Sequence, residues 1–160
     1  KITWIPFYLF LAYFLISRFS KKGLIVFLLG CLTVGIADFT SSTLIKQNIK
    51  RLRPCNVEQP PHPVIERVHC GGGYSFTSSH AANHFSLAVF LILALGQRFR
   101  WIKWPLLIWA ASISFSQIYV GVHFPIDILC GGILGSLLAW LVFSTFANFY
   151  PATIIRRDYT

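Results

Sequence analysis

The chain has 160 residues, of which 55% are hydrophobic and only 12% are charged. Average soluble domains carry about 25% charged residues, so this composition argues against a soluble globular protein. The formal net charge is +9. No basic stretch interleaved with aromatic residues accompanies it, so we expect an anionic lipid surface or an anionic substrate as the partner, and no nucleic acid.

Five apolar stretches of ~16–25 residues occur along the chain, and about 20 residues are needed to cross a bilayer. Helices are the expected conformation, because lipid offers no partner for unpaired backbone groups. The sequence therefore predicts an all-α, polytopic transmembrane helical bundle that forms a single domain over residues 1–160. The five stretches are residues 2–17, 23–45, 78–97, 104–122 and 125–149.

The connections between these stretches differ in their content of Lys and Arg. Connections on the cytoplasmic side of a membrane carry an excess of these residues. One side has eight and the other has six, or four if Lys46 and Arg53 are set aside as substrate ligands. This bias predicts that the residue 46–77 loop and the turn at His123 face outward. For a bacterial inner membrane, the outer side is the periplasm. The richer side holds Arg18, Lys21, Lys22, Arg98, Arg100, Lys103, Arg156 and Arg157.

The short connection before the last apolar stretch carries an ionisable pair. His123 and Asp127 lie four residues apart in the segment SQIYVGVHFPID, and Pro125 suits the first position of the following helix. Ionisable side chains at the mouth of a membrane helix are unfavourable unless they serve a function. A carboxylate beside one imidazole nitrogen fixes the tautomer and makes the other nitrogen a better nucleophile or base. We therefore expect His123 and Asp127 to touch.

A basic segment, KQNIKRLRP, follows the second apolar stretch. If it is helical, Lys46 and Arg53 lie about 10 Å apart on one face, and Pro54 ends the helix or turns the chain. Two cations there suit an anion with several oxygens, or alternatively lipid headgroups. Ser78 or Ser79 caps the next helix, whose free N–H groups and dipole also favour a phosphate.

Two histidines open the third apolar stretch. His80 lies in its first turn, and His84 follows one turn later on the same face. A pair at this spacing can bind a metal, but no Glu lies between the two and no third ligand clusters with them. We therefore expect no metal site and no cofactor, and we interpret His84 as a residue that packs against or supports the site.

The basic segment and the first His resemble two motifs of the type-2 phosphatidic-acid phosphatase superfamily. The motif KxxxxxxRP is matched in full by Lys46, Arg53 and Pro54. The motif PSGH is matched by TSSH at Ser78 and His80, with Thr and Ser in place of Pro and Gly.

The connection at His123 resembles the third motif of that superfamily, SRxxxxxHxxxD. Ser116, His123 and Asp127 match, and Gln117 stands where the family has Arg. Gln donates hydrogen bonds but carries no charge, and losing one charged contact costs about 2–3 kcal/mol. Lys50 or Arg51 could supply the missing charge.

The resemblance implies a metal-independent lipid phosphatase. His123 would attack phosphorus and form a phosphohistidine, Asp127 would orient it, and His80 would protonate the leaving oxygen. The family also implies six helices, so we expect one more before Lys1. The size and short loops are similar to bacterial envelope members that act on undecaprenyl pyrophosphate, phosphatidylglycerophosphate or lipid A 1-phosphate. The phosphoryl oxygens would be held by Lys46, Arg53, Ser78, Ser79 and Gln117.

Two other functions remain open. A lipid-binding pseudophosphatase would follow if Gln117 abolished activity. A small proton-linked transporter would use Asp38, inside the second stretch, with the histidines. The transporter predicts charges spread through several stretches, whereas here they cluster at one face.

The loop between the second and third stretches carries two cysteines, Cys55 and Cys70. If it faces an oxidising compartment, a disulfide between them would stabilise it by roughly 3 kcal/mol. We expect headgroup selectivity to arise from residues 56–73 of this loop. In the last stretch, Gly131 and Gly135 form a GxxxG pattern, which we interpret as close helix packing within the monomer. The sequence leaves the oligomeric state open.

Overall fold

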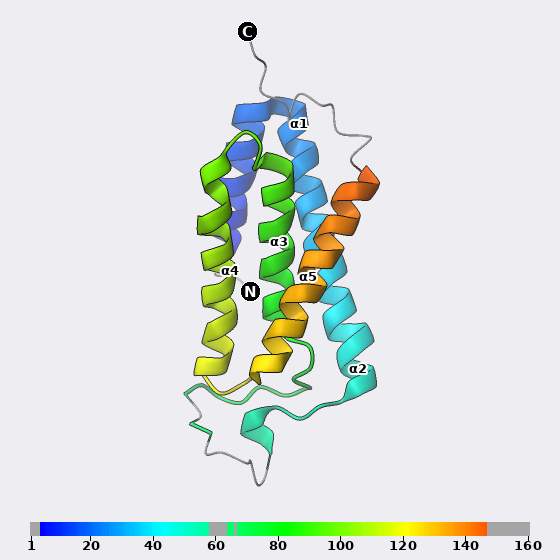
Figure 1. Ribbon diagram of the computed structural model, residues 1–160, viewed down its shortest axis with the longest axis vertical. Coiled ribbons are helices and arrows are strands. Elements are labelled where there is room, and N and C mark those ends of the chain that lie inside the picture. The colour runs from blue at the N-terminus through cyan, green and yellow to red at the C-terminus, as the bar shows by residue number, and fades with distance from the viewer. Residues whose placement is uncertain (1–3, 58–63, 66, 147–160) are drawn as a thin grey trace.

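The computed structural model describes residues 4–57, 64–65 and 67–146, and these form helices and connections without a strand (Figure 1). The observed helices follow the expected apolar stretches, except that the first two are joined and that 147–149 lie outside the described residues. The helices are α1 (Ile5–Phe39), a π-helical segment η2 (Thr40–Ile45), α2 (Lys46–Ile49), η3 (Pro54–Asn56), α3 (Ser79–Leu95), η4 (Arg100–Ile102), α4 (Lys103–Tyr119) and α5 (Pro125–Phe146).

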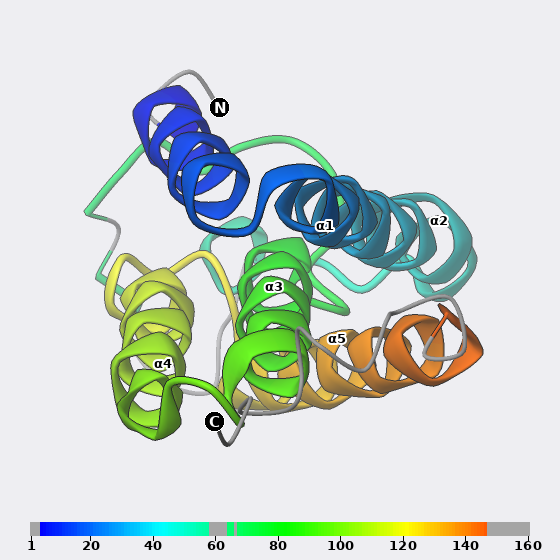
Figure 2. The same ribbon diagram turned by 90° about the horizontal axis from the view of Figure 1, so that it is seen from above.

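Helix α1 is a hairpin of two arms rather than one straight rod. The backbone of Ser20 departs from helical geometry, at φ 53° and ψ −132°, and the chain reverses there (Figures 1 and 2). The two arms correspond to the first two apolar stretches. Gly23 follows the reversal, and a Cβ at this position would overlap the carbonyl group of Leu15. Only glycine fits so tight a return.

Helix α3 occupies the centre of the bundle. Seen from above, the two arms of α1, helix α4 and helix α5 surround it (Figure 2), and α3 contacts all three helices. Phe90 and Leu95 of α3 pack with Leu15 and Val26 of α1 and with Val142 of α5 in the apolar core. Lipid tails are as apolar as these side chains, so close van der Waals packing between the helices holds the arrangement together.

The outer surface of the bundle is apolar as well. Large hydrophobic side chains such as Phe10, Leu28, Phe115 and Leu137 are each exposed by more than half. Within the described residues, the stretches Ile5–Asn56 and Pro125–Phe146 are long and apolar enough to cross a membrane, and Ser79–Leu95 is a shorter apolar helix. An exterior of this kind suits a lipid solvent.

The polar ends of the helices meet at one end of the bundle. The end of α2, the start of α3, the end of α4 and the start of α5 lie together at the lower end in Figure 1. The loop between α2 and α3 is fastened there. Cys55 and Cys70 form a disulfide with their Cα atoms 6.0 Å apart, and Ser75 donates hydrogen bonds to the carbonyls of Arg51 and Leu52.

Glycines let α5 approach α3 closely at this end. A Cβ at Gly131 would lie 2.5 Å from the carbonyl oxygen of Ser78, and one at Gly135 would overlap the carbonyl group of Ala82. The GxxxG pattern therefore packs helices within the monomer, as predicted. The contact matters for the site because Asp127 lies one turn before Gly131 on the same helix.

Candidate active site

The start of α5 holds Asp127 and His123 next to each other. Helix α5 begins at Pro125 as predicted, and the buried Asp127 lies in its first turn. The Phe124 N–H donates to Asp127 Oδ2 at 2.9 Å, and the His123 N–H donates to the carbonyl of Gln117 at 3.2 Å. These bonds fix the turn, so that His123 Nδ1 lies 3.5 Å from Asp127 Oδ2. The pair is in contact, but that distance is longer than a hydrogen bond.

Arg51 supplies the second partner of Asp127. Its guanidinium donates to Asp127 Oδ1 at 3.0 Å and lies over the ring of Phe124, 4.2 Å from the centroid. The Arg51 side chain is 37% exposed and the Asp127 side chain is fully buried. The motif match assigned no role to Arg51. The sequence signal for Arg51 was its place in the basic segment. From there it could supply the positive charge that is missing at position 117, where the family has Arg.

The basic segment departs from the expected continuous helix. Helix α2 ends at Ile49, because Lys50 takes a left-handed conformation with φ 52° and ψ 32°. Arg53 is extended, as the residue before Pro54 must be. The expectation that Lys46 and Arg53 share one helical face is therefore wrong, and the turn at Lys50 brings Arg53 back to the bundle instead.

Lys46 and Arg53 nevertheless lie near His123. Burial lowers the pKa of His123 below its ordinary value of 6.5, and the positive charges of Lys46 and Arg53 lower it further, while the Asp127 carboxylate opposes the change. His123 is consequently neutral at pH 7. Its Nδ1 faces Asp127, which leaves Nε2 as the nitrogen with a free lone pair.

The start of α3 adds hydroxyl and N–H groups. Ser78 is the N-cap, as predicted for one of the two serines, and its Oγ accepts from the N–H of Ala81 at 3.4 Å. The Ser78 N–H donates to the backbone carbonyl of Asp127 at 3.0 Å, which ties α3 to α5. Across the described part of the chain, five polar side-chain atoms near these elements are buried without a hydrogen-bond partner: Arg53 Nε, Thr77 Oγ1, Ser79 Oγ, Asn83 Oδ1 and His123 Nδ1.

Gln117 lies at the end of α4. Its side-chain amide donates to the hydroxyl of Ser116 at 3.2 Å. One of the two N–H donors of the amide is therefore engaged within its own helix, and the position contributes no charge to the site.

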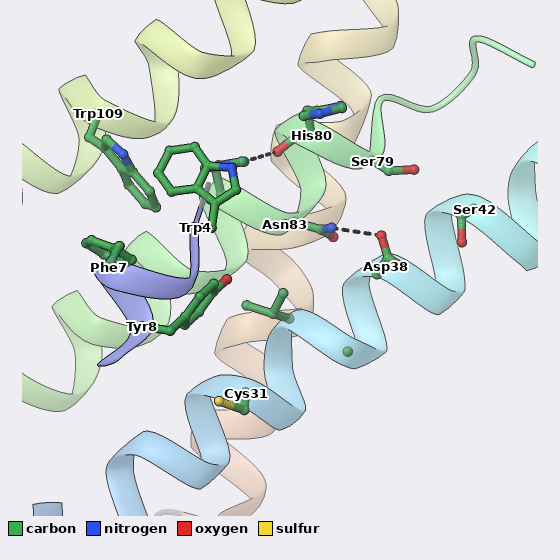
Figure 3. Close-up of a pocket in the computed structure, with 13 residues that line it drawn as sticks. Trp4, Phe7, Tyr8, Cys31, Asp38, Ser42, Ser79, His80, Asn83 and Trp109 are labelled. Atoms are coloured by element: carbon green, nitrogen blue, oxygen red, sulfur yellow. Dashed lines mark hydrogen bonds between the residues drawn. The ribbon is translucent and has the colours of Figure 1, made fainter. Parts of the chain in front are cut away.

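A cavity of about 740 Å³ opens beside His80, between both arms of α1 and helices α3 and α4 (Figure 3). His80 is exposed toward it, whereas His123 is buried and does not line it. The rings of His80 and His84 are parallel, with centroids 6.4 Å apart. His84 Nδ1 bonds to the carbonyl of His80 at 2.7 Å, and its ring packs between Trp4 and Trp109. His84 thus packs and supports the helix, as interpreted from the sequence.

Asp38 also lines this cavity. Its Oδ1 accepts a hydrogen bond from the side-chain amide of Asn83 at 2.8 Å (Figure 3). The pair joins α1 to α3 about one helical turn from His80. The motif match gave no role to Asn83, and nothing in its sequence context marked it.

The chain is similar to a known protein family and to several of its members. The model of the PAP2 superfamily matches residues 23–151. A lipid A 4'-phosphatase of Bacteroides thetaiotaomicron is 35% identical over 89% of this chain and 64% of its own length. An undecaprenyl-diphosphatase of Sulfolobus acidocaldarius is 30% identical over 88% of this chain and 62% of its own length. The chain thus spans less than two thirds of these curated relatives.

A solved structure has the same fold. The crystal structure of a transmembrane PAP2-type phosphatidylglycerolphosphate phosphatase from Bacillus subtilis superposes with a TM-score of 0.67 and 23% identity, over 99% of this chain and 73% of that one. The prediction of an all-α transmembrane bundle is therefore confirmed.

Proposed function

Because the chain belongs to the PAP2 superfamily, as its three motifs predicted, we propose that it hydrolyses the phosphate of a membrane lipid. The nucleophile is His123, the orienting carboxylate is Asp127, and the acid that serves the leaving group is His80. The phosphoryl oxygens are held by the following residues: Lys46, Arg53, Ser78, Ser79 and Gln117.

The first step transfers the phosphoryl group to the enzyme. The lone pair of His123 Nε2 attacks phosphorus as the bond from phosphorus to the leaving oxygen breaks. That oxygen takes the bonding electrons and a proton from His80, and the lipid alcohol departs. The phosphohistidine carries a positive imidazolium ring, which the negative charge of Asp127 stabilises.

The second step releases phosphate. A water oxygen attacks phosphorus, the N–P bond breaks, and its electrons return to His123 Nε2. His80, now neutral, accepts the proton of that water and is restored for the next cycle. Both steps spread charge over the phosphoryl oxygens, so most of the stabilisation comes from fixed cations and N–H groups.

One observation carries this proposal. Among the described residues, Arg53 Nε and the hydroxyls of Thr77 and Ser79 are buried without partners. Arg53 is close enough to His123 to lower its pKa, and Thr77 and Ser79 flank Ser78, whose N–H donates to the backbone carbonyl of Asp127. Buried polar groups in native proteins are almost always hydrogen-bonded, so unpaired groups of this kind suit a ligand. Donors beside a neutral histidine suit a phosphate. The transporter alternative finds less support, since Asp38 is engaged with Asn83 at the same end of the bundle.

The lipid substrate is proposed to lie in the outer leaflet of a bacterial inner membrane, with the site facing the periplasm. The Lys and Arg bias of the sequence and the disulfide in the loop beside the site support this orientation, because disulfides persist in oxidising compartments.

The test uses purified protein in detergent with EDTA present and a panel of lipid phosphates and diphosphates. Release of phosphate is expected for wild type and is expected to fall by at least about 10³-fold in His123→Ala. The variant Gln97→Ala, at the opposite end of α3, serves as the matched control. No release from any lipid would refute the enzyme proposal and favour a pseudophosphatase. Release that survives in His123→Ala would refute the nucleophile.

A further inference from the structure

The cavity beside His80 contains polar groups that the proposed reaction does not use. These groups are Asp38 and Asn83, which line the cavity side by side and are joined by their hydrogen bond (Figure 3). Within the described residues, the side-chain oxygen of Asn83 is buried without a hydrogen-bond partner. Its volume of about 740 Å³ lies within the range of ligand sites.

The position of this cavity relates it to the leaving group of the substrate. In-line displacement places the leaving oxygen opposite the attacking nitrogen. Under the proposed function that oxygen receives its proton from His80, so the leaving group lies on the His80 side and the nucleophile His123 on the other. His80 lines the cavity and His123 does not. The cavity is where the leaving group goes.

The side chains that line the cavity favour some leaving groups over others. Its polar part offers a carboxylate acceptor at Asp38 and an amide oxygen at Asn83, both of which suit a ligand with O–H or amide N–H donors. Its other part is aromatic, with Trp4 and Trp109 at 5.8 Å between ring centroids.

A diphosphate substrate fits this cavity poorly. Its leaving group is a lipid monophosphate, which carries negative charge at the place where a neutral alcohol would otherwise depart. The Asp38 carboxylate repels that charge, and a hydrocarbon chain leaves the Asn83 oxygen unpaired. Sites built to hydrogen-bond a substrate hydroxyl discriminate strongly against analogues that lack one.

We propose, building on the proposed function, that Asp38 and Asn83 form a leaving-group subsite that selects phosphate monoesters of neutral, sugar-bearing lipids over polyprenyl diphosphates. Asp38 accepts a donor of the sugar or of its amide, and Asn83 holds the carboxylate in place while offering its own oxygen. These are specificity residues and take no part in the chemistry at phosphorus.

The first experiment compares kcat/KM for an acylated glucosamine phosphate and for farnesyl diphosphate in mixed micelles. Asp38→Asn preserves the side-chain shape, and it is expected to lower the glycolipid-to-diphosphate ratio by about 10- to 100-fold, the effect of losing one charge-assisted hydrogen bond. Asn83→Ala is expected to shift the ratio in the same direction. Asn48→Ala, a helical Asn whose side chain bonds to its own helix at Leu44, is the matched control. An unchanged ratio in Asp38→Asn, or an equal loss for both substrates, would overturn the proposal.

A second experiment does not depend on turnover. Cys31 is a free cysteine that lines the same cavity, and Cys130→Ala removes the other free thiol of the described residues. The dephosphorylated acylglucosamine is expected to slow alkylation of Cys31, and about 10-fold more ligand is expected to be needed in Asp38→Asn. Equal protection in both proteins would overturn the subsite. If wild type hydrolyses no lipid while this protection depends on Asp38, the proposed function fails and the subsite stands.

Discussion

Adding one methyl group to the α3–α5 contact tests how the site is positioned. A Cβ at Gly131 would lie 2.5 Å from the Ser78 carbonyl oxygen, whereas ordinary contact begins at 3.4 Å. Because the obstacle is helix backbone, Gly131→Ala has to separate α5 from α3 by about 1 Å, and gaps of this size forfeit a quarter to a half of each lost contact. We expect Gly131→Ala to lower the free energy of unfolding by about 1–3 kcal/mol.

The neighbouring Gly132 provides the matched control. A Cβ there would lie 3.2 Å from the side chain of Phe85, which can move. Gly132→Ala gains up to about 1 kcal/mol of helix propensity and is expected to be neutral or stabilising. The measurement is SDS-induced unfolding in mild detergent, followed by phosphate release from the same samples. Activity is expected to fall in Gly131→Ala alone, because Asp127 moves with α5. Equal behaviour of the two variants would refute the argument.

Three further predictions concern the charges and the loop. The pKa of His123 is lowered mainly by burial, so its neutral form persists on acidification, and the acid limb of the rate of phosphohistidine formation is expected below pH 6.5. A limb above that value would contradict the prediction. Arg51→Gln is expected to lower kcat by about 10- to 100-fold, because it removes a charged partner of Asp127. Arg51→Lys is expected to recover part of this loss. A change in KM alone would contradict a positioning role for Arg51. Reduction of the disulfide between Cys55 and Cys70 is expected to lower the free energy of unfolding by roughly 3 kcal/mol, measured by SDS titration with and without reductant, and no change would show that the loop is held by its other contacts.

The features of the site that local rules govern were predictable from sequence. Pro125 begins α5 because its ring suits the first helical position, and Ser78 caps α3 because its hydroxyl accepts a free N–H. Each depends on a few adjacent residues. The three motifs lie at successive helix ends that antiparallel packing places at the same end of the bundle, so their convergence was predictable as well.

The features that depend on distant residues were not predictable. Lys50 adopts a left-handed conformation that a non-glycine residue rarely takes, and no local pattern marks it. Arg51 pairs with Asp127 across 76 positions, a contact that only the folded bundle defines. The Asp38–Asn83 pair likewise exists because the second arm of α1 packs on α3. The expectation that residues 56–73 set headgroup selectivity falls partly outside the described residues and remains a prediction.

The reversal at Ser20 has a mechanical consequence for the cavity. Trp4, Phe7 and Tyr8 line it from the far end of the first arm of α1, and the second arm forms the opposite wall. With 1.5 Å of rise per residue, Trp4 lies about 24 Å from the turn. A tilt of about 5° at Ser20 therefore moves Trp4 by about 2 Å, enough to widen or narrow the space for a leaving group. The geometry of the turn at Ser20 therefore bears on the width of the cavity, although Ser20 lies at the other end of the bundle and does not line the cavity.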